Sequence, residues 1–519
     1  MKLTVVGWVV SLLVLALALR PRRAPDVADG VPPRPWRGAL VVFALAVVSR
    51  LWLRRHFGGD WFFADEQLDA CILPVEFRAG EPMWAGGTSY PIYVVTLALY
   101  RIFGFAPSVA RLGSVLAFAT GAALLHAAAG RIVGARAARR ASAVLLCIAP
   151  FLTHGVYATA VAWALAPVAA VLLVLSGTTV GPLAAFVLGP LLAGALYAYP
   201  GAFIAGVALI GAHLVCWRDR WLPASRVSGL VGLALGVALA LGARAWFGGH
   251  LVVAQWGHGA FAPGQALGEL GVVLRDLLWK ARTWNTLTPG APWLEPVLVG
   301  FVLLALAGGG RLVDERRRWA WTLALAVVGT ILLSTLGGPQ PGARRAIGAL
   351  PLLAVLAGRG MLEAARRAPA GLGTAAMLLA FAVVVDRGVH VVGRWPQRPL
   401  PDFVVGARAA LAAEEVAGHA VVVLAEPSDP YGGEEWRCAI ALDDRLGPRL
   451  GHVRAIRRLG LADAPDVPRR KTVLLASVPL DQGALQALFG RMPIRTRFRG
   501  EEGPPDASRL RAIYVFPPR

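Results

Sequence analysis

Apolar and polar positions along this chain separate on the scale of whole helices. Apolar runs of about 20 residues, the length that crosses the hydrocarbon core of a bilayer, recur up to residue 390. Short arginine-rich stretches separate many of these runs, and no such run follows residue 390. The pattern predicts an all-α polytopic membrane protein whose C-terminal segment lies outside the bilayer.

Arginine clusters orient the predicted helices, because cytoplasmic loops of membrane proteins carry an excess of Lys and Arg. The clusters are Arg20 to Arg23, Arg131 to Arg140, Arg218 to Arg220, Arg311 to Arg318, and Arg366 with Arg367. The first cluster directly follows the apolar run from Leu3 to Leu19, which lacks a convincing small-x-small cleavage site. We therefore expect this run to be an uncleaved span rather than a signal peptide.

Residues 141–217 lie between two arginine clusters and contain no Lys, Arg, Asp or Glu. An even number of crossings must lie there, and the length fits four. We expect the breaks near His154, at Gly177 to Gly181 and at Tyr199-Pro200. With these four, about twelve spans are predicted: 3–19, 38–53, 108–130, four within 141–217, 227–246, 293–310, 319–336, 345–361 and 371–390.

Three parts follow from this count. They are an extra N-terminal span with a cytoplasmic linker (1–37), a membrane domain (38–390) and an external tail (391–519). The membrane domain has two long external loops, 56–107 and 247–292.

The tail reads as a small α/β domain. Short β-like runs at 420–425, 472–478 and 512–516 alternate with helix-like runs such as 481–489, and Pro and Gly separate them.

The composition agrees with a bilayer environment. Hydrophobic residues make up 56% of the chain and charged residues 16%, and the mean hydropathy is +0.59. The first 390 residues hold 33 Lys and Arg against 16 Asp and Glu, and the tail holds 19 against 15. The net charge of +21 therefore belongs mainly to the membrane part, where it sets orientation, and does not indicate nucleic-acid binding. No Walker-type loop, G-x-S-x-G elbow or metal-ligand cysteine spacing occurs.

Six carboxylates gather in the first external loop. They are Asp60, Asp65, Glu66, Asp69, Glu76 and Glu81. The pair Asp65-Glu66 follows the aromatic run Trp61 to Phe63, which is typical of a membrane interface, and the apolar stretch Tyr90–Phe105 beyond it predicts an interfacial helix. A carboxylate held there and partly desolvated has the raised basicity needed to take a proton from a hydroxyl group. Solvated surface acids are the alternative interpretation.

Two segments carry a resemblance to a known family. The run FADEQLDA from Phe63 to Ala70 and the run GTSYPIYVVTLALYRIFGFAPSVARL from Gly87 to Leu112 resemble GT-C-type polyprenyl-phosphate-sugar glycosyltransferases. Within these, the chain is most similar to the bacterial protein O-mannosyltransferases and the aminoarabinose transferases of lipid A. Further matching positions are Arg131 to Gly134, Arg344, Arg345, Pro351 and Gly360.

The resemblance implies an inverting transfer of a sugar from a polyprenyl-phosphate donor to a hydroxyl of a lipid, glycan or protein. It places the reaction on the periplasmic or extracellular face of the inner or plasma membrane. By position, Asp65 is the general base, and Glu66 orients the acceptor or holds a divalent metal. Asp69, Trp84 and Tyr90 are expected to shape the loop or contact the acceptor.

Cations near the outer interface are needed to stabilise the departing lipid phosphate. The candidates are Arg345 first, then Arg344, Lys280 and Arg282, with Arg54 and Arg55 beside the acidic loop. For each of them, a side chain that snorkels to lipid headgroups is the alternative interpretation.

Two other classes of function fit parts of the pattern. A transporter or lipid flippase also has about twelve spans, but such proteins usually place ionisable groups or broken helices at mid-membrane in two related halves. A non-catalytic membrane scaffold is the third class, and the intact Asp65-Glu66 pair disfavours it.

Overall fold

The computed structural model describes the chain in segments. In the membrane part they are residues 2–16, 35–57, 90–104, 106–157, 159–247, 263–279, 291–307, 315–335, 345–368 and 371–393, and in the tail residues 420–424, 452–456, 472–476, 482–489, 493, 495–498 and 512–516. These residues form two compact units. The first contains the described residues of 1–58, 83–92 and 111–395, and the second contains those of 93–110 and 396–519.

Helices make up the described part of the chain before residue 394. They are α1 (Lys2–Ala16), α2 (Pro35–Phe57), α5 (Tyr90–Phe103), α6 (Pro107–Val133), α7 (Ala135–Cys147), α8 (Ala149–His154), η3 (Ala160–Ala164), α9 (Leu165–Leu175), α10 (Pro182–Ala198), α11 (Pro200–Cys216), η4 (Arg218–Arg220), α12 (Pro223–Phe247), α14 (Pro263–Leu278), α15 (Pro296–Ala307), α16 (Glu315–Thr335), η6 (Ala346–Ala349), α18 (Leu350–Arg367) and α19 (Leu372–Gly393).

The stretch without charged residues breaks where the sequence predicts. The first break, Gly155–Thr159, separates the pair α7–α8 from the pair η3–α9. The second, Ser176–Gly181, separates that pair from α10, and the third, Tyr199, separates α10 from α11. Proline lies in the first turn of α8, α10 and α11, where a helix loses nothing by the missing N–H.

Six described helices are long and apolar enough to cross a bilayer. They are Trp36–Phe57, Pro107–Val133, Pro223–Gly242, Glu315–Thr335, Ala346–Arg367 and Gly373–Gly393, and five shorter apolar helices accompany them. The multi-pass helical fold is confirmed, and the count of twelve spans stays a prediction. The loop predicted at 247–292 contains the helix α14, which a search for long apolar runs misses because its apolar residues follow a helical period.

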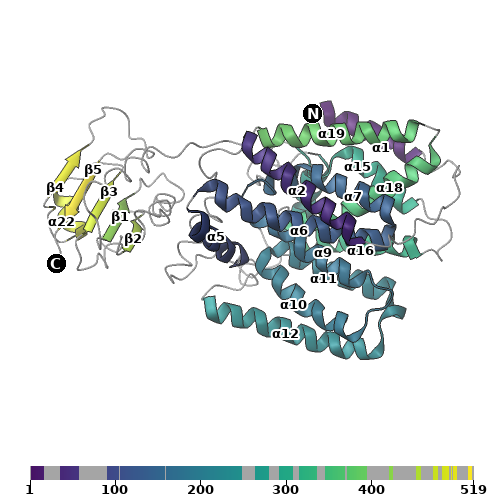
Figure 1. The fold of residues 1–519 in the computed structure, drawn as a ribbon, viewed down its shortest axis with the longest axis horizontal. Coiled ribbons are helices and arrows are strands. Elements are labelled where there is room, and N and C mark those ends of the chain that lie inside the picture. The colour runs from purple at the N-terminus through teal and green to yellow at the C-terminus, as the bar shows by residue number, and fades with distance from the viewer. Residues whose placement is uncertain are drawn as a thin grey trace. The chain divides into compact units, whose positions relative to one another are not determined.

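Small residues allow close packing between the helices of the first unit. A side chain at Gly300 of α15 would overlap the backbone of Ser11 in α1, and the Gly300 N–H donates to the Ser11 hydroxyl at 3.0 Å. On α12, a side chain at Gly232 would overlap the backbone of Phe186 in α10, and these two helices lie side by side (Figure 1). Van der Waals contact of this kind replaces the hydrophobic effect between helices in lipid.

An aromatic cluster ties η4 to the ends of α11 and α16. Trp217 is fully buried, and its indole N–H donates to the Thr322 hydroxyl at 2.9 Å. The Trp221 indole N–H donates to His213 Nδ1 at 3.0 Å, and Trp319 packs 5.3 Å from the ring centres of both His213 and Trp217.

The described strands of the tail form one mixed sheet. They are β1 (Ala420–Leu424), β2 (His452–Ile456), β3 (Thr472–Ala476), β4 (Arg495–Phe498) and β5 (Ala512–Phe516), with the helix α22 (Gln482–Phe489) between β3 and β4 in sequence. The order is β2-β1-β3-β5-β4, parallel among β2, β1 and β3 and antiparallel for β5 with β3 and β4. The apolar pattern misses β2 and β4 because both carry basic residues. The α/β domain as a whole remains a prediction.

Candidate functional site

We name the two ends of the helical unit after the predicted topology. The outer end is the one that carries Phe57, Tyr157, Tyr199 and Arg345, and the inner end is the one that carries Val133, Trp217 and Glu315. The predicted chemistry lies at the outer end.

Arg345 directly precedes η6 and is buried at the outer end, with only 9% of its surface exposed. Its backbone lies directly against the start of α11, because a side chain at Gly201 would overlap the Arg345 carbonyl. Arginine stays protonated in proteins at neutral pH. This position therefore holds a buried positive charge.

The burial of Arg345 bears on the alternative interpretation, in which its side chain snorkels to lipid headgroups. A snorkelling cation keeps its charged head among water and lipid headgroups. Arg345 is instead enclosed by protein, and Glu269 from α14 is close enough for its charge to act on it. This burial disfavours the snorkelling interpretation for Arg345.

A second buried cation lies near the outer end of α2. Arg50 is 1% exposed, and its guanidinium donates to the Leu146 carbonyl at 2.8 Å and to the Ser49 hydroxyl at 3.2 Å. Its Cζ lies 4.4 Å from the centre of the Phe118 ring, a cation–π contact. Its Nε has no hydrogen-bond partner among the described residues.

Arg50 was not among the predicted site residues, although the sequence carries a signal for it. An ionisable residue inside an apolar span is by default a candidate for function, and Arg50 falls inside the predicted span 38–53. Arg50 was missed because many other arginines flank the spans, and a single charge near the end of one span resembles them.

The end of α2 and the turn after α8 lie close to Arg111 of α6. The Tyr157 hydroxyl donates to the Phe57 carbonyl at 3.2 Å, and the Arg111 guanidinium lies 5.2 Å from the centre of the Tyr157 ring. Arg54 is close enough to Arg111 for the two like charges to act on each other. Arg55, in contrast, is exposed, which fits the snorkelling interpretation.

Two buried carboxylates border the same end of the helices. Asp276, near the end of α14, is fully buried and pairs with Arg275 at 2.8 Å, and its carbonyl accepts from the Trp293 N–H at 3.1 Å. Glu295, just before α15, lies 3.4 Å from Arg387 of α19. These contacts join α14, α15 and α19. Among the described residues there is no group of three or more His, Cys, Asp or Glu side chains that could hold a metal.

The structure describes the side chains of three predicted site residues, Arg345, Arg54 and Arg55. Seven others lie outside the described residues, namely Asp65, Glu66, Asp69, Trp84, Lys280, Arg282 and Arg344. Tyr90 is described only as the first residue of α5. The roles of Asp65 and Glu66, and the metal option at Glu66, therefore stay predictions.

The arrangement defines a multi-pass helical membrane protein with buried arginines, among them Arg50 and Arg345 at the outer end. No protein-family model matches the chain, and no curated protein matches it. Solved structures do match, and among them are GT-C glycosyltransferases, the type that the sequence resembles.

Three of these structures illustrate the similarity. ArnT from Cupriavidus metallidurans is 16% identical, with a TM-score of 0.41, over 92% of this chain and 98% of that chain, and one of its structures is bound to undecaprenyl phosphate. The oligosaccharyltransferase AglB from Archaeoglobus fulgidus, in complex with an inhibitory peptide and a dolichol-phosphate, is 11% identical, with a TM-score of 0.46, over 84% and 69%. The arabinofuranosyltransferase AftD from Mycobacteria is 15% identical, with a TM-score of 0.46, over 94% and 40%.

Proposed function

We propose that this chain is a membrane glycosyltransferase that moves a sugar from a polyprenyl-phosphate donor to a hydroxyl-bearing acceptor. The reaction takes place at the outer end of the helices, on the periplasmic or extracellular face of the membrane. The observation that carries the proposal is the buried Arg345 on the same predicted side as the acidic loop around Asp65.

The reaction we propose is a single displacement. Asp65 accepts the proton of the acceptor hydroxyl, whose oxygen attacks the anomeric carbon from the face opposite the phosphate. The bond between that carbon and the phosphate oxygen breaks, and the configuration inverts. Polyprenyl phosphate leaves with the bonding electron pair. Glu66 orients the acceptor.

Arg345 suits the stabilisation of that leaving group. A cation in a water-poor site interacts with a phosphate more strongly than one in water, because the local dielectric constant is low. Arg345 is nine-tenths buried and is fixed through the tight contact of its backbone with Gly201. A guanidinium can also give two parallel hydrogen bonds to a phosphate.

Purified protein in lipid nanodiscs, supplied with a radiolabelled polyprenyl-phosphate sugar and a panel of lipid, glycan and peptide acceptors, tests the proposal. Transfer of label should vanish in Asp65→Asn. The matched control is Glu81→Gln, which neutralises another acid of the same loop and should leave transfer within about twofold of the wild type, because the sequence predicts Glu81 to be a solvated surface acid.

Other outcomes identify the rival functions. Movement of the labelled lipid across the bilayer without transfer would identify a transporter or flippase. If neither transfer nor translocation is seen with any acceptor, the chain is a non-catalytic scaffold. Equal activity of Asp65→Asn and wild type would show that Asp65 is not the general base.

A further inference from the structure

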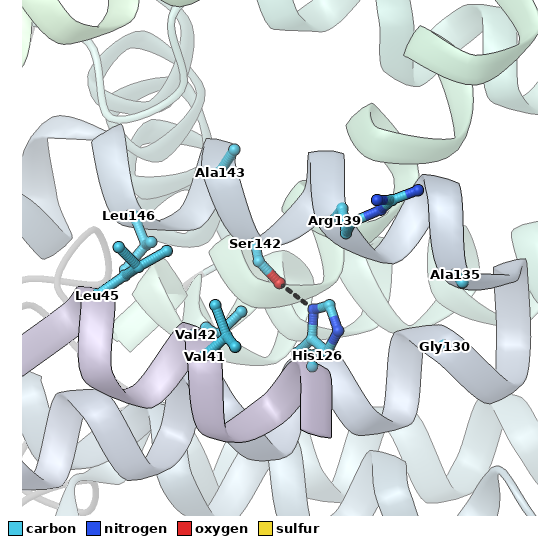
Figure 2. Close-up of a pocket in the computed structure, with 11 residues that line it drawn as sticks. Val41, Val42, Leu45, His126, Gly130, Ala135, Arg139, Ser142, Ala143 and Leu146 are labelled. Atoms are coloured by element: carbon cyan, nitrogen blue, oxygen red, sulfur yellow. Dashed lines mark hydrogen bonds between the residues drawn. The ribbon is translucent and has the colours of Figure 1, made fainter. Parts of the chain in front are cut away.

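A groove of about 520 Å³ runs between α2, α6 and α7 near their inner ends. One end of it is apolar, where Leu45 of α2 lies near Leu146 of α7 (Figure 2). The other end holds His126 of α6 and Arg139 of α7. The volume falls within the range of about 300 to 1,000 Å³ that is usual for small-molecule sites.

Small residues create the space for this groove. Gly38 of α2, Gly130 of α6 and Ala143 of α7 all line it. At Gly38 even a methyl group would overlap the His126 imidazole, so α2 approaches this ring as closely as its backbone allows. Val41 and Leu45 on the adjoining turns remain 59% and 55% exposed, which gives the groove an apolar wall open to the surroundings.

The polar end of the groove is held in place by hydrogen bonds. The Ser142 hydroxyl donates to the Ala138 carbonyl at 3.0 Å, and the same oxygen lies 2.9 Å from His126 Nδ1 (Figure 2). A hydroxyl has only one proton, so His126 Nδ1 donates to Ser142. Arg139 is exposed and is close enough for its charge to act on His126.

Positive charge at this end has no acidic counterpart in the helices that form the groove. No Asp or Glu occurs between Glu81 and Asp219, which includes all of α6 and α7, and none occurs in α2. The ten residues from 131 to 140 include four arginines. The cytoplasmic leaflet of a membrane carries anionic lipids, and each Lys or Arg near its surface adds about 1 kcal/mol to the attraction between the protein and these lipids.

The groove also has the orientation of a lipid in the cytoplasmic leaflet. Gly38 and Arg139 are near the predicted inner ends of their helices, and Leu45 and Leu146 are each seven residues further along, roughly 10 Å towards the bilayer centre. The order from charged to apolar therefore matches the order from headgroup to acyl chain.

We propose that this groove binds one anionic glycerophospholipid of the cytoplasmic leaflet. The acyl chain lies along Val41, Leu45 and Leu146, and the phosphate pairs with Arg139 beside His126. The site is separate from Arg345, which belongs to the outer end, whereas Arg50 bonds to the backbone carbonyl of Leu146 at the apolar end of the groove. A transmembrane helix of a partner would fit the apolar wall, but it would leave Arg139 facing an apolar segment.

Native mass spectrometry of the purified full chain, titrated with phosphatidylglycerol or phosphatidylcholine, tests this site. The wild type should retain one phosphatidylglycerol per chain with higher affinity than phosphatidylcholine. Arg139→Gln should weaken phosphatidylglycerol binding about fivefold, the factor that corresponds to about 1 kcal/mol. The matched control is Arg136→Gln, an exposed arginine of the same helix that does not line the groove, with an expected change below about twofold.

A second variant tests the apolar part without touching a charge. Ala143→Phe fills the groove and should reduce retention of phosphatidylglycerol at unchanged unfolding temperature. Leu40→Phe is its control, since Leu40 is 68% exposed on α2 and does not line the groove.

Several results would overturn the proposal. Equal losses in Arg139→Gln and Arg136→Gln would indicate diffuse attraction of annular lipid. Unchanged binding in Ala143→Phe, equal retention of the two lipids, or preferential retention of undecaprenyl phosphate would exclude this occupant. A mass of two chains that Ala143→Phe converts to one would show that a second copy fills the groove.

Discussion

Arg220 and Arg318 at the inner end of the helical unit and Arg50 at the outer end use their charge in opposite ways. At the inner end, Arg318 donates to both carboxylate oxygens of Asp219 at 2.9 and 3.2 Å, and Arg220 pairs with Glu315. The guanidinium groups of Arg220 and Arg318 also lie over the Trp217 ring, at 4.0 and 4.5 Å from its centre. At the outer end, Arg50 is buried and bonds to a carbonyl and a hydroxyl, which are neutral.

This difference distinguishes arginines with a structural role from arginines that could take part in the reaction. A carboxylate partner neutralises each of the two inner arginines, so their charge serves to join η4 to α16. The charge of Arg50 is not balanced by any ion pair among the described residues. Changes at Arg220 or Arg318 should therefore act on stability, and a change at Arg345 should act mainly on catalysis.

The largest expected effect is on stability at the inner end. Trp217→Ala removes a fully buried ring that four other aromatic or cationic side chains contact, and it should lower the free energy of unfolding by about 3 to 5 kcal/mol. Denaturant titration in detergent measures this. Trp36→Ala, where the ring is 50% exposed, is the control. A small effect at Trp217 would contradict the structural role of the cluster that joins η4 to α11 and α16.

Arg345→Gln should act mainly on the reaction. Loss of one positive group at a developing charge typically lowers kcat about 10²- to 10³-fold. The unfolding temperature should change little. Arg318→Gln at the inner end is the matched control and should keep kcat within about twofold. If the two variants lose activity equally, the contrast between the ends is wrong.

Arg50→Gln should affect both properties to an intermediate degree. The shorter amide loses the bond to Leu146 and the contact with Phe118, which should cost about 1 to 3 kcal/mol of stability. Arg50→Lys keeps the charge and should retain more transfer activity than Arg50→Gln at similar stability. Equal activity of the two variants would show that the charge of Arg50 has no part in catalysis.

Asp219→Asn is expected to have the smallest effect, and this effect should depend on pH. The hydrogen bond from Arg318 lowers the pKa of the Asp219 carboxyl below its ordinary value of 3.8. The stabilisation is therefore fully present above pH 3.8 and is lost as the pH falls through the lowered pKa. Wild type should unfold at a slightly higher temperature than Asp219→Asn at about pH 7, and the difference should vanish at lower pH and at high salt. A difference that persists in strong acid would point to another cause.

Local patterns predicted the helices better than the sheet or the site. The breaks at 155–159, 176–181 and Tyr199 appear where glycine, proline and polarity mark them, because a helix end is decided by neighbouring residues. The amphipathic α14 and the basic strands β2 and β4 were missed because polar or charged residues interrupt their apolar residues, so that none of them forms a long apolar run. Their structure depends on what they pack against.

The candidate site was only partly predictable. Arg345 could be chosen because it is a cation next to a span, but its burial depends on Gly201 and Glu269, which are 144 and 76 residues away in the sequence. Arg50 shows the reverse case, since its position in an apolar span was visible in the sequence and its partners Leu146 and Phe118 were not.

The sequence by itself determined a multi-pass helical membrane protein, the positions of its helix breaks, and the concentration of acids around Asp65, because these follow from run length, proline and charge placement. Tertiary structure alone decided which cations are buried and which are paired, and where a groove remains between helices. Such properties depend on residues that are far apart along the chain and meet only when α2, α6, α7, α11 and α18 pack together.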